Sequence, residues 1–338
     1  MLLAVLAPLG RGAAAQDVRF RDRVDVESVV VDARVVDGSG RPILGLTAGD
    51  FRLRVDGHVQ PVQSVTWVAD DRRTEPDAST PPADANTAAD APPPPRGRLI
   101  VFFFQKDLDA SRATGLLQML RRAREMLDGL GEDDRVAVVS FDSHLHVWSD
   151  FTSDRARLRH VLDRSILFER TAALAVSPEP SLAAHLEAGA ARRAATPETA
   201  LLQLGEALGA VPGAKSLVLF GWGMGQWAPG VGVFLDKDYG PARRALVAGR
   251  VTVFALDITN ADFHTLEVGL EQVAEDTGGF YAKTHLFAGQ AMARLENALA
   301  GHYVLTFAKP ALRAGEHAID IDLVGRKGRV LARPTYEG

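Results

Sequence analysis

The middle of the chain alternates between short apolar runs and amphipathic segments. Residues 99–104 are continuously apolar, which is typical of a strand buried on both faces of a sheet. Residues 111–127 place leucine and alanine three and four positions apart, which predicts an amphipathic helix. The same patterns predict further strands at 136–141, 145–148, 216–220 and 251–256, and helices at 153–162 (with Ser153 as cap), from 196 onward, 241–248, 263–276 and 288–299. Strands alternating with helices predict a doubly wound α/β domain over residues 97–301, with a mostly parallel sheet and helices on both faces.

Both ends of the chain have the period-two alternation of β-strands. Strands are predicted at 24–27, 29–36, 51–55 and 60–67, and again at 303–307, 317–323 and 329–333. Asp56 and Gly57 form a tight hairpin signal between two of them. Strands with one apolar face need a partner sheet. We therefore expect an N-terminal β module, residues 17–68, to pack with residues 302–338 as one small β-sandwich.

Two further segments differ in composition from the rest. Residues 69–96 are rich in proline, alanine and aspartate and end in consecutive prolines, which predicts a solvated linker. Residues 1–15 are apolar and end in an alanine run, as in the later part of a secretory signal peptide. No positive charge precedes the apolar run, so we expect the true start to lie upstream of Met1. A secreted or periplasmic protein is predicted, and no later segment has the ~20 apolar residues of a membrane span.

Composition excludes several kinds of chemistry. The 338 residues carry a net charge of −5, so there is no excess of positive charge for binding nucleic acid. The chain has no cysteine, which excludes disulfides, thiolate metal sites and cysteine nucleophiles. Neither G-x-S-x-G nor H-E-x-x-H occurs, so hydrolases and zinc proteases lose their usual motifs. The prediction is a protein that is not an enzyme and has no resident cofactor.

Five blocks of sequence, in order, resemble the bacterial VWFA-related proteins of the acidobacterial type. They are residues 29–51 with Asp56 and Gly57, then 132–141, 213–220, 274–279 and 302–305. The resemblance implies a von Willebrand factor type A (VWA) fold, in which ligands bind at the carboxyl edge of the sheet. It also implies an adhesion-type or protein-binding module, whose protein partner contacts the loops after Phe104, Phe220 and Leu256.

Metal-binding members of this family use D-x-S-x-S after the first strand, a threonine from a second loop and an aspartate from a third. This chain has Gln105 at the first position, Asp107 and Asp109 in place of the serines, and Thr199 at the threonine position. Residues 221–225 of the third loop contain no carboxylate. A degenerate, metal-independent site is therefore predicted, in which Asp109 or Ser111 caps the next helix. The alternative is a receptor that binds Mg²⁺ or another divalent cation through these oxygen ligands.

The glycine-rich loop after residue 220 supplies further candidate partner-binding residues. Trp222, Met224 and Trp227 have the side chains that protein interfaces favour, and Gln105, Asp107 and Asp109 lie on the neighbouring loop. Equally, the two tryptophans and the methionine can fold back over the sheet edge as core.

Two other patterns are weaker. Gly221, Gly223 and Gly225 suggest a nucleotide-binding or hydrolytic α/β enzyme as a further alternative, but the spacing is not G-x-G-x-x-G and no basic residue lies close by. The pair His144 and His146 has the residue types of a transition-metal site. Because the sequence shows no clear third ligand, a polar hairpin face is the preferred interpretation.

Overall fold

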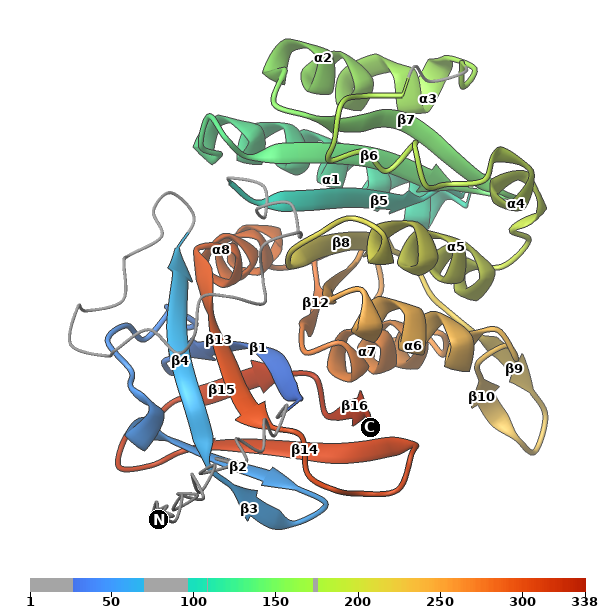
Figure 1. The fold of residues 1–338 in the computed structure, drawn as a ribbon. Helices are drawn as coiled ribbons and strands as arrows, with labels where there is room; N and C mark the ends of the chain where they lie inside the picture. Colours follow the sequence, from blue (N-terminus) through green and yellow to red (C-terminus); the bar gives the residue numbers. More distant parts are fainter. Residues whose placement is uncertain (1–26, 70–96, 108, 173–175) are drawn as a thin grey trace, which may run out of the picture.

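The computed structural model describes residues 27–69, 97–107, 109–172 and 176–338, drawn in colour in Figure 1. The predicted signal peptide, the predicted strand at 24–27 except Glu27, and all of the predicted linker except Ala69 lie outside these residues. Within the described ranges, none of the helices is long and apolar enough to cross a membrane.

A six-stranded sheet forms the centre of the molecule, in the order β12-β11-β8-β5-β6-β7. Its strands are β5 (Leu99–Gln105), β6 (Arg135–Phe141), β7 (Leu145–Thr152), β8 (Lys215–Gly221), β11 (Val251–Asp257) and β12 (Phe280–Lys283). All neighbours are parallel except β7, which runs antiparallel to β6 at one edge. The predicted fold class, a doubly wound and mostly parallel α/β sheet, is confirmed. Strand β12 was not predicted from the sequence.

Helices cover both faces of this sheet. They are α1 (Ala110–Met126), α2 (Arg155–His160), α3 (Ile166–Phe168), α4 (Ala188–Arg193), α5 (Pro197–Gly209), α6 (Tyr239–Ala248), α7 (Glu267–Asp276) and α8 (Ala288–Leu299), with the short 3₁₀-helix η2 (Leu127–Gly129) and the π-helical segment η3 (Val161–Ser165). A further 3₁₀-helix, η1 (Ala48–Asp50), lies in the N-terminal part of the chain, outside this domain. Phe102 and Phe104 of β5 face the core formed with α1 and α8, while Val101 and Phe103 face the core formed with α5 and α6. The alternation of the strand therefore supplies both cores. The helix expected at 153–162 begins later, because Asp154 rather than Ser153 provides the cap.

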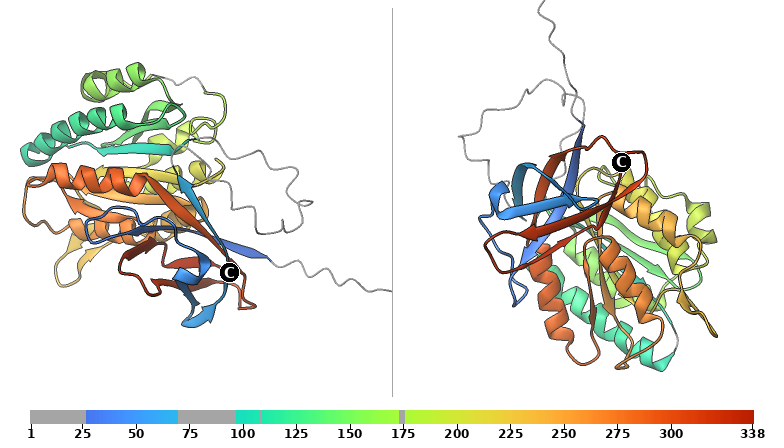
Figure 2. Two further views of the ribbon diagram at one scale, coloured as in Figure 1. Left: turned by 90° about the vertical axis from the view of Figure 1, so that its left-hand side faces the viewer. Right: turned by 90° about the horizontal axis from the view of Figure 1, so that it is seen from below.

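The two ends of the chain form a β-sandwich beside this domain (Figures 1 and 2). One sheet has the order β15-β1-β13-β4 and the other β16-β14-β2-β3. The strands are β1 (Ser28–Val36), β2 (Phe51–Val55), β3 (His58–Gln60), β4 (Val62–Ala69), β13 (Gly301–Ala308), β14 (Glu316–Leu323), β15 (Arg329–Ala332) and β16 (Thr335–Glu337). Val31, Leu53 and Phe307 meet in its core, so strands from both termini share one hydrophobic interior.

Arg34 of β1 joins the sandwich to the α/β domain. Its buried guanidinium donates to Ser216 at the start of β8 and to Thr252 at the start of β11, at 3.2 and 3.0 Å. It also donates to the carbonyl of Ala298 at the end of α8, at 2.9 Å. The sandwich thus contacts the amino end of β8 and β11, opposite the edge where parallel strands of such folds present their ligand loops.

Candidate functional site

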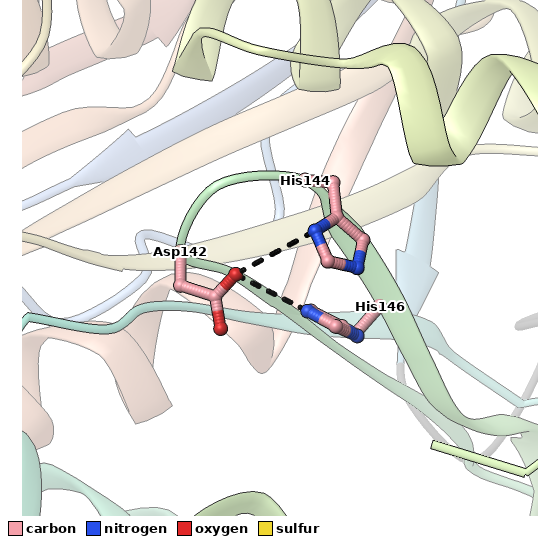
Figure 3. A group of neighbouring side chains, drawn as sticks. All are labelled: Asp142, His144 and His146. Carbon is pink, nitrogen blue, oxygen red and sulfur yellow. Dashed lines mark hydrogen bonds and ion pairs between the residues drawn. The ribbon is translucent and has the colours of Figure 1, made fainter. Parts of the chain in front are cut away.

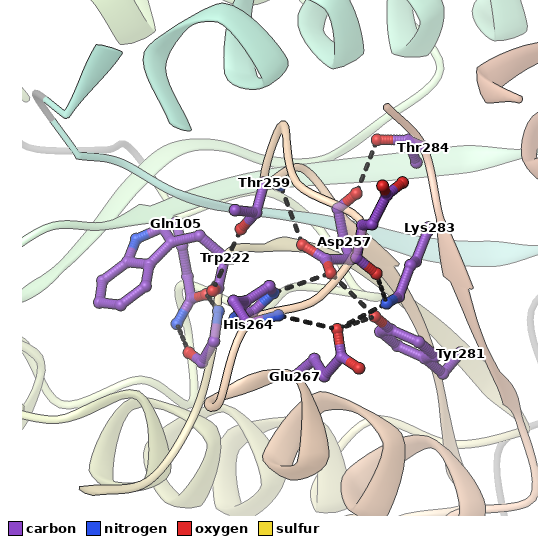
Figure 4. Close-up of polar contacts among 11 residues, drawn as sticks. Gln105, Trp222, Asp257, Thr259, His264, Glu267, Tyr281, Lys283 and Thr284 are labelled. Atoms are coloured by element: carbon purple, nitrogen blue, oxygen red, sulfur yellow. Dashed lines mark hydrogen bonds and ion pairs between the residues drawn. The ribbon is translucent and has the colours of Figure 1, made fainter. Parts of the chain in front are cut away.

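The carboxyl ends of β5, β8 and β11 lie side by side, and Gln105 ties two of their loops together. Its side-chain amide donates to the carbonyl of Gly223 at 3.0 Å, and its oxygen accepts from the backbone N–H of Trp222 at 2.8 Å. Gln105 is fully buried. Gln105, which was predicted to contact a partner, instead directs its side chain inward and holds the glycine-rich loop (Figure 4).

Asp107 and Asp109 organise the start of α1. Asp109 caps the helix by accepting from the backbone N–H of Ser111 at 2.9 Å, as the capping interpretation predicted. The hydrogen bond from the Ser111 hydroxyl is the main cause of the lowered pKa of Asp109. Asp107 accepts from the N–H of Asp109 at 2.9 Å and forms an ion pair with Arg112. Both carboxylates are thus engaged by their own loop and the first turn of α1.

Thr199 has a partner in a different loop. Its hydroxyl donates to Asp238, the residue before α6, at 3.0 Å. Asp238 lies in the connection between β8 and α6, which begins with the glycine-rich residues 221–225. This third loop therefore does contain a carboxylate, but it lies farther along the chain than residues 221–225. Among the described residues, neither Asp107 nor Asp109 belongs to a group of three acidic or histidine side chains close enough to share an ion.

The two tryptophans and the methionine of the glycine-rich loop have different environments. Met224, which was predicted to contact a partner, is 1% exposed and belongs to the core, where it packs closely on Gly269 of α7. Trp222 is half-buried, and the guanidinium of Arg112 lies 3.9 Å from its ring centroid. Trp227 is 59% exposed. The alternative of folding back as core therefore holds for Met224 but not for Trp227.

Trp227 lies on a two-stranded hairpin that was not predicted from the sequence. Strands β9 (Gln226–Ala228) and β10 (Gly232–Phe234) pair antiparallel, with Trp227 opposite Val233. Val231 at the turn is 71% exposed and Phe234 is 42% exposed. This hairpin, which we call the β9–β10 hairpin, projects from the α/β domain on the side away from the sandwich (Figure 1).

A polar cluster, shown in Figure 4, lies at the ends of β11 and β12. Asp257 is 1% exposed and accepts from Tyr281 at 2.8 Å, and it lies 2.9 Å from Nε2 of His264. Glu267 pairs with Lys283 at 2.8 Å. Burial and the neighbouring Asp257 raise the pKa of Tyr281, so the phenol stays protonated and donates.

This cluster was missed because no local motif contains it. The loop after Leu256 was predicted to bind a partner, and it contributes His264. The other members of the cluster come from β11, β12 and α7. Ligand atoms of Asp257, His264 and Glu267 lie within 4.8 Å of one another, close enough to hold a metal ion. Asp257 accepts a hydrogen bond from Tyr281, and Glu267 forms an ion pair with Lys283. Both carboxylates therefore have partners within the cluster without an ion.

A second group of potential metal ligands lies at the turn between β6 and β7 (Figure 3). It consists of His144 and His146, the pair noted in the sequence, together with Asp142. The third ligand was missed because it comes from the preceding strand end rather than from the H-x-H segment. The turn between β6 and β7 brings the carboxylate to the two imidazoles.

Neither a protein-family model nor a curated protein matches the sequence. Among solved structures, a von Willebrand factor type A protein from Catenulispora acidiphila is 11% identical with a TM-score of 0.43, covering 88% of this chain and 74% of that chain. The human COPII-coat protein Sec24c is 14% identical with a TM-score of 0.41, covering 72% of this chain and 44% of that chain. BatB from Bacteroides thetaiotaomicron is 13% identical with a TM-score of 0.38, covering 60% and 98%. The chain thus spans less than half of Sec24c, and similarity at this level does not indicate what it binds.

Proposed function

We propose that this protein is an exported, non-enzymatic binding module of the VWA class, and that it captures a protein partner through the β9–β10 hairpin. The observation that carries the proposal is the exposure of Trp227, Val231 and Phe234 together on this short hairpin. Exposed aromatic and aliphatic side chains grouped on one element are typical of interaction surfaces. Tryptophan is among the residues that contribute most to binding when a partner covers them.

The hairpin is supported well enough to present these side chains in one arrangement. An isolated two-stranded hairpin is only marginally stable in water. Here β10 packs against α7, and Gly225, with φ of 89°, brings the loop so close that a side chain there would meet the carbonyl of Phe234 at 2.8 Å. A supported hairpin loses less conformational entropy on binding than a mobile loop, which favours affinity.

One observation supports partner binding without a metal ion at Asp107 and Asp109. A second supports a protein that is not an enzyme. Asp107 and Asp109 are engaged by Arg112 and by the helix start, so they do not need a cation to balance them. In the polar cluster, His264 lies beside Asp257, and the nearby phenol of Tyr281 has a raised pKa, which disfavours it as a nucleophile.

Capture from the source organism's own exported proteins tests the proposal. The immobilised full chain is expected to retain one specific protein, and Trp227→Ala is expected to lose it. Val59→Ser on β3 is the matched control, because Val59 is an equally exposed hydrophobic residue (66%) on the sandwich. Equal retention by wild type and Trp227→Ala, or loss in the Val59→Ser control alone, would place the interface elsewhere.

A further inference from the structure

The turn between β6 and β7 aligns two imidazoles by the geometry of the strand. His144 and His146 are two positions apart, so they lie on the same face, while Leu145 between them is buried. Their ring centroids are 4.0 Å apart. Both rings remain open to solvent, with 37% of the His144 side chain and 17% of the His146 side chain exposed.

Asp142 completes a set of three ligand atoms. Its Oδ1 atom lies 3.2 Å from Nε2 of His146 and 3.9 Å from Nδ1 of His144. One ligand atom from each of the three residues lies within 4.8 Å of the other two. In a tetrahedral zinc site with bonds of about 2.0–2.1 Å, ligand atoms are about 3.3 Å apart. Small side-chain rotations are therefore enough to place one ion at bonding distance from all three.

The second ring nitrogen of His146 is already held by a hydroxyl. Its Nδ1 atom lies 2.7 Å from Oγ1 of Thr171, which fixes the orientation of the ring. Metal-binding histidines commonly have such a partner on the nitrogen that does not bind the metal. Asp142 differs, because the backbone N–H of Ser143 donates to the same Oδ1 atom that faces the two imidazoles, at 2.5 Å. This bond fixes the carboxylate, and the oxygen has a second lone pair that can bind an ion.

We propose that Asp142, His144 and His146 bind a transition-metal ion, with Zn²⁺ as the expected ion and water in the fourth position. Two imidazoles with one carboxylate favour Zn²⁺ and related ions over Mg²⁺ and Ca²⁺, which prefer all-oxygen sites. The site is distinct from the residues that correspond to the family's metal site, Gln105, Asp107, Asp109 and Thr199. It does not depend on the partner-binding role of the β9–β10 hairpin.

The positive charge of Lys106 competes with a metal ion for Asp142. The ammonium of Lys106 lies 3.6 Å from Oδ2 of Asp142 and is a competing positive charge. Lys106 has a long, partly exposed side chain that can move into solvent, so it weakens the site without blocking it. Removing this charge should therefore strengthen Zn²⁺ binding, whereas removing a ligand weakens it. Lys106→Gln is expected to bind Zn²⁺ several-fold more tightly than wild type.

Zn²⁺ titration of the full chain against a chromophoric chelator tests the proposal. Wild type is expected to bind one ion at this site, and His144→Ala and His146→Ala are each expected to weaken it at least tenfold. His264→Ala is the matched control, because His264 belongs to the other cluster that can hold a metal. Co²⁺ in place of Zn²⁺ is expected to show the visible absorption of a four-coordinate ion.

The possible failures are distinguishable. No binding by wild type, or loss in His264→Ala with retention in His144→Ala, would overturn the proposal. Unchanged circular dichroism and thermal midpoints without metal show that the variants fold. Tighter binding by Lys106→Gln supports the site independently of any variant that removes a ligand, and weaker binding contradicts it.

Discussion

The guanidinium of Arg250 contacts both carboxylate oxygens of Asp32, with Nε–Oδ2 and Nη2–Oδ1 distances of 2.9 and 2.5 Å. This pair joins β1 of the sandwich to the turn that begins β11. Burial acts to raise the pKa of Asp32, but the hydrogen bond from Arg250 and nearby positive charge hold it below the ordinary value. The junction between the two parts of the molecule is therefore built from charged groups that depend on one another.

Removing the carboxylate of this pair is expected to be strongly destabilising. Asp32→Asn leaves Arg250 and the buried Arg34 without their counter-charge, which costs about 3–5 kcal/mol for buried pairs. Urea unfolding of the full chain measures the loss. Glu125→Gln, which breaks an exposed pair with Arg122, is the control and is expected to cost less than about 1 kcal/mol. A similar small effect for Asp32→Asn would mean that the junction does not rely on this pair.

His302 makes the stability of the protein sensitive to mild acid. Burial lowers its pKa from 6.5 to about 4, with Asp32, Arg34 and Arg250 as the charged groups that face it. Between these values the unfolded chain binds a proton that the folded chain does not, so stability falls as the pH falls from 6.5 to 4. The full difference corresponds to roughly 3 kcal/mol. The unfolding free energy of His302→Gln is expected to change less over this window; parallel pH profiles for the two proteins would contradict the assignment.

Gln105 is expected to position the glycine-rich loop. Gln105→Leu leaves the N–H groups of Trp222 and Gly223 and the carbonyl of Gly223 without their partner, at a cost of about 1–3 kcal/mol for each buried group left unpaired. Hydrogen exchange at these amides is expected to accelerate, and overall stability to fall. Gln290→Leu on the exposed face of α8 serves as the control. Unaltered exchange in Gln105→Leu would show that the loop is held by other contacts.

Mg²⁺ is expected to leave the thermal stability of the protein unchanged. Binding at about 100 times the dissociation constant would contribute about 2.7 kcal/mol, which moves a melting midpoint by several degrees. Because Asp107 and Asp109 are engaged locally, no such shift is predicted between chelator and millimolar Mg²⁺. A rise that disappears in Asp107→Ala would instead support the divalent-metal-dependent receptor.

Some of these features follow from local sequence and others do not. The strict alternation of β14 and the apolar run of β5 predict strands, and Asp109 has the residue type and position of a helix cap. The direction of side chains on the glycine-rich loop does not follow from residue type, since Met224 turns inward and Trp227 outward. Asp257 and Tyr281 meet only because β11 and β12 pair, and β12 is too short to stand out in the sequence.

The affinity of the captured partner for wild type and for Trp227→Ala tests the central claim most directly. Hot-spot tryptophans contribute about 2 kcal/mol or more. The dissociation constant is therefore expected to rise at least about 30-fold in Trp227→Ala. Val59→Ser is expected to bind as wild type does, and a chelator specific for divalent cations is expected to leave both values unchanged. An unchanged dissociation constant in Trp227→Ala would contradict partner binding through the β9–β10 hairpin.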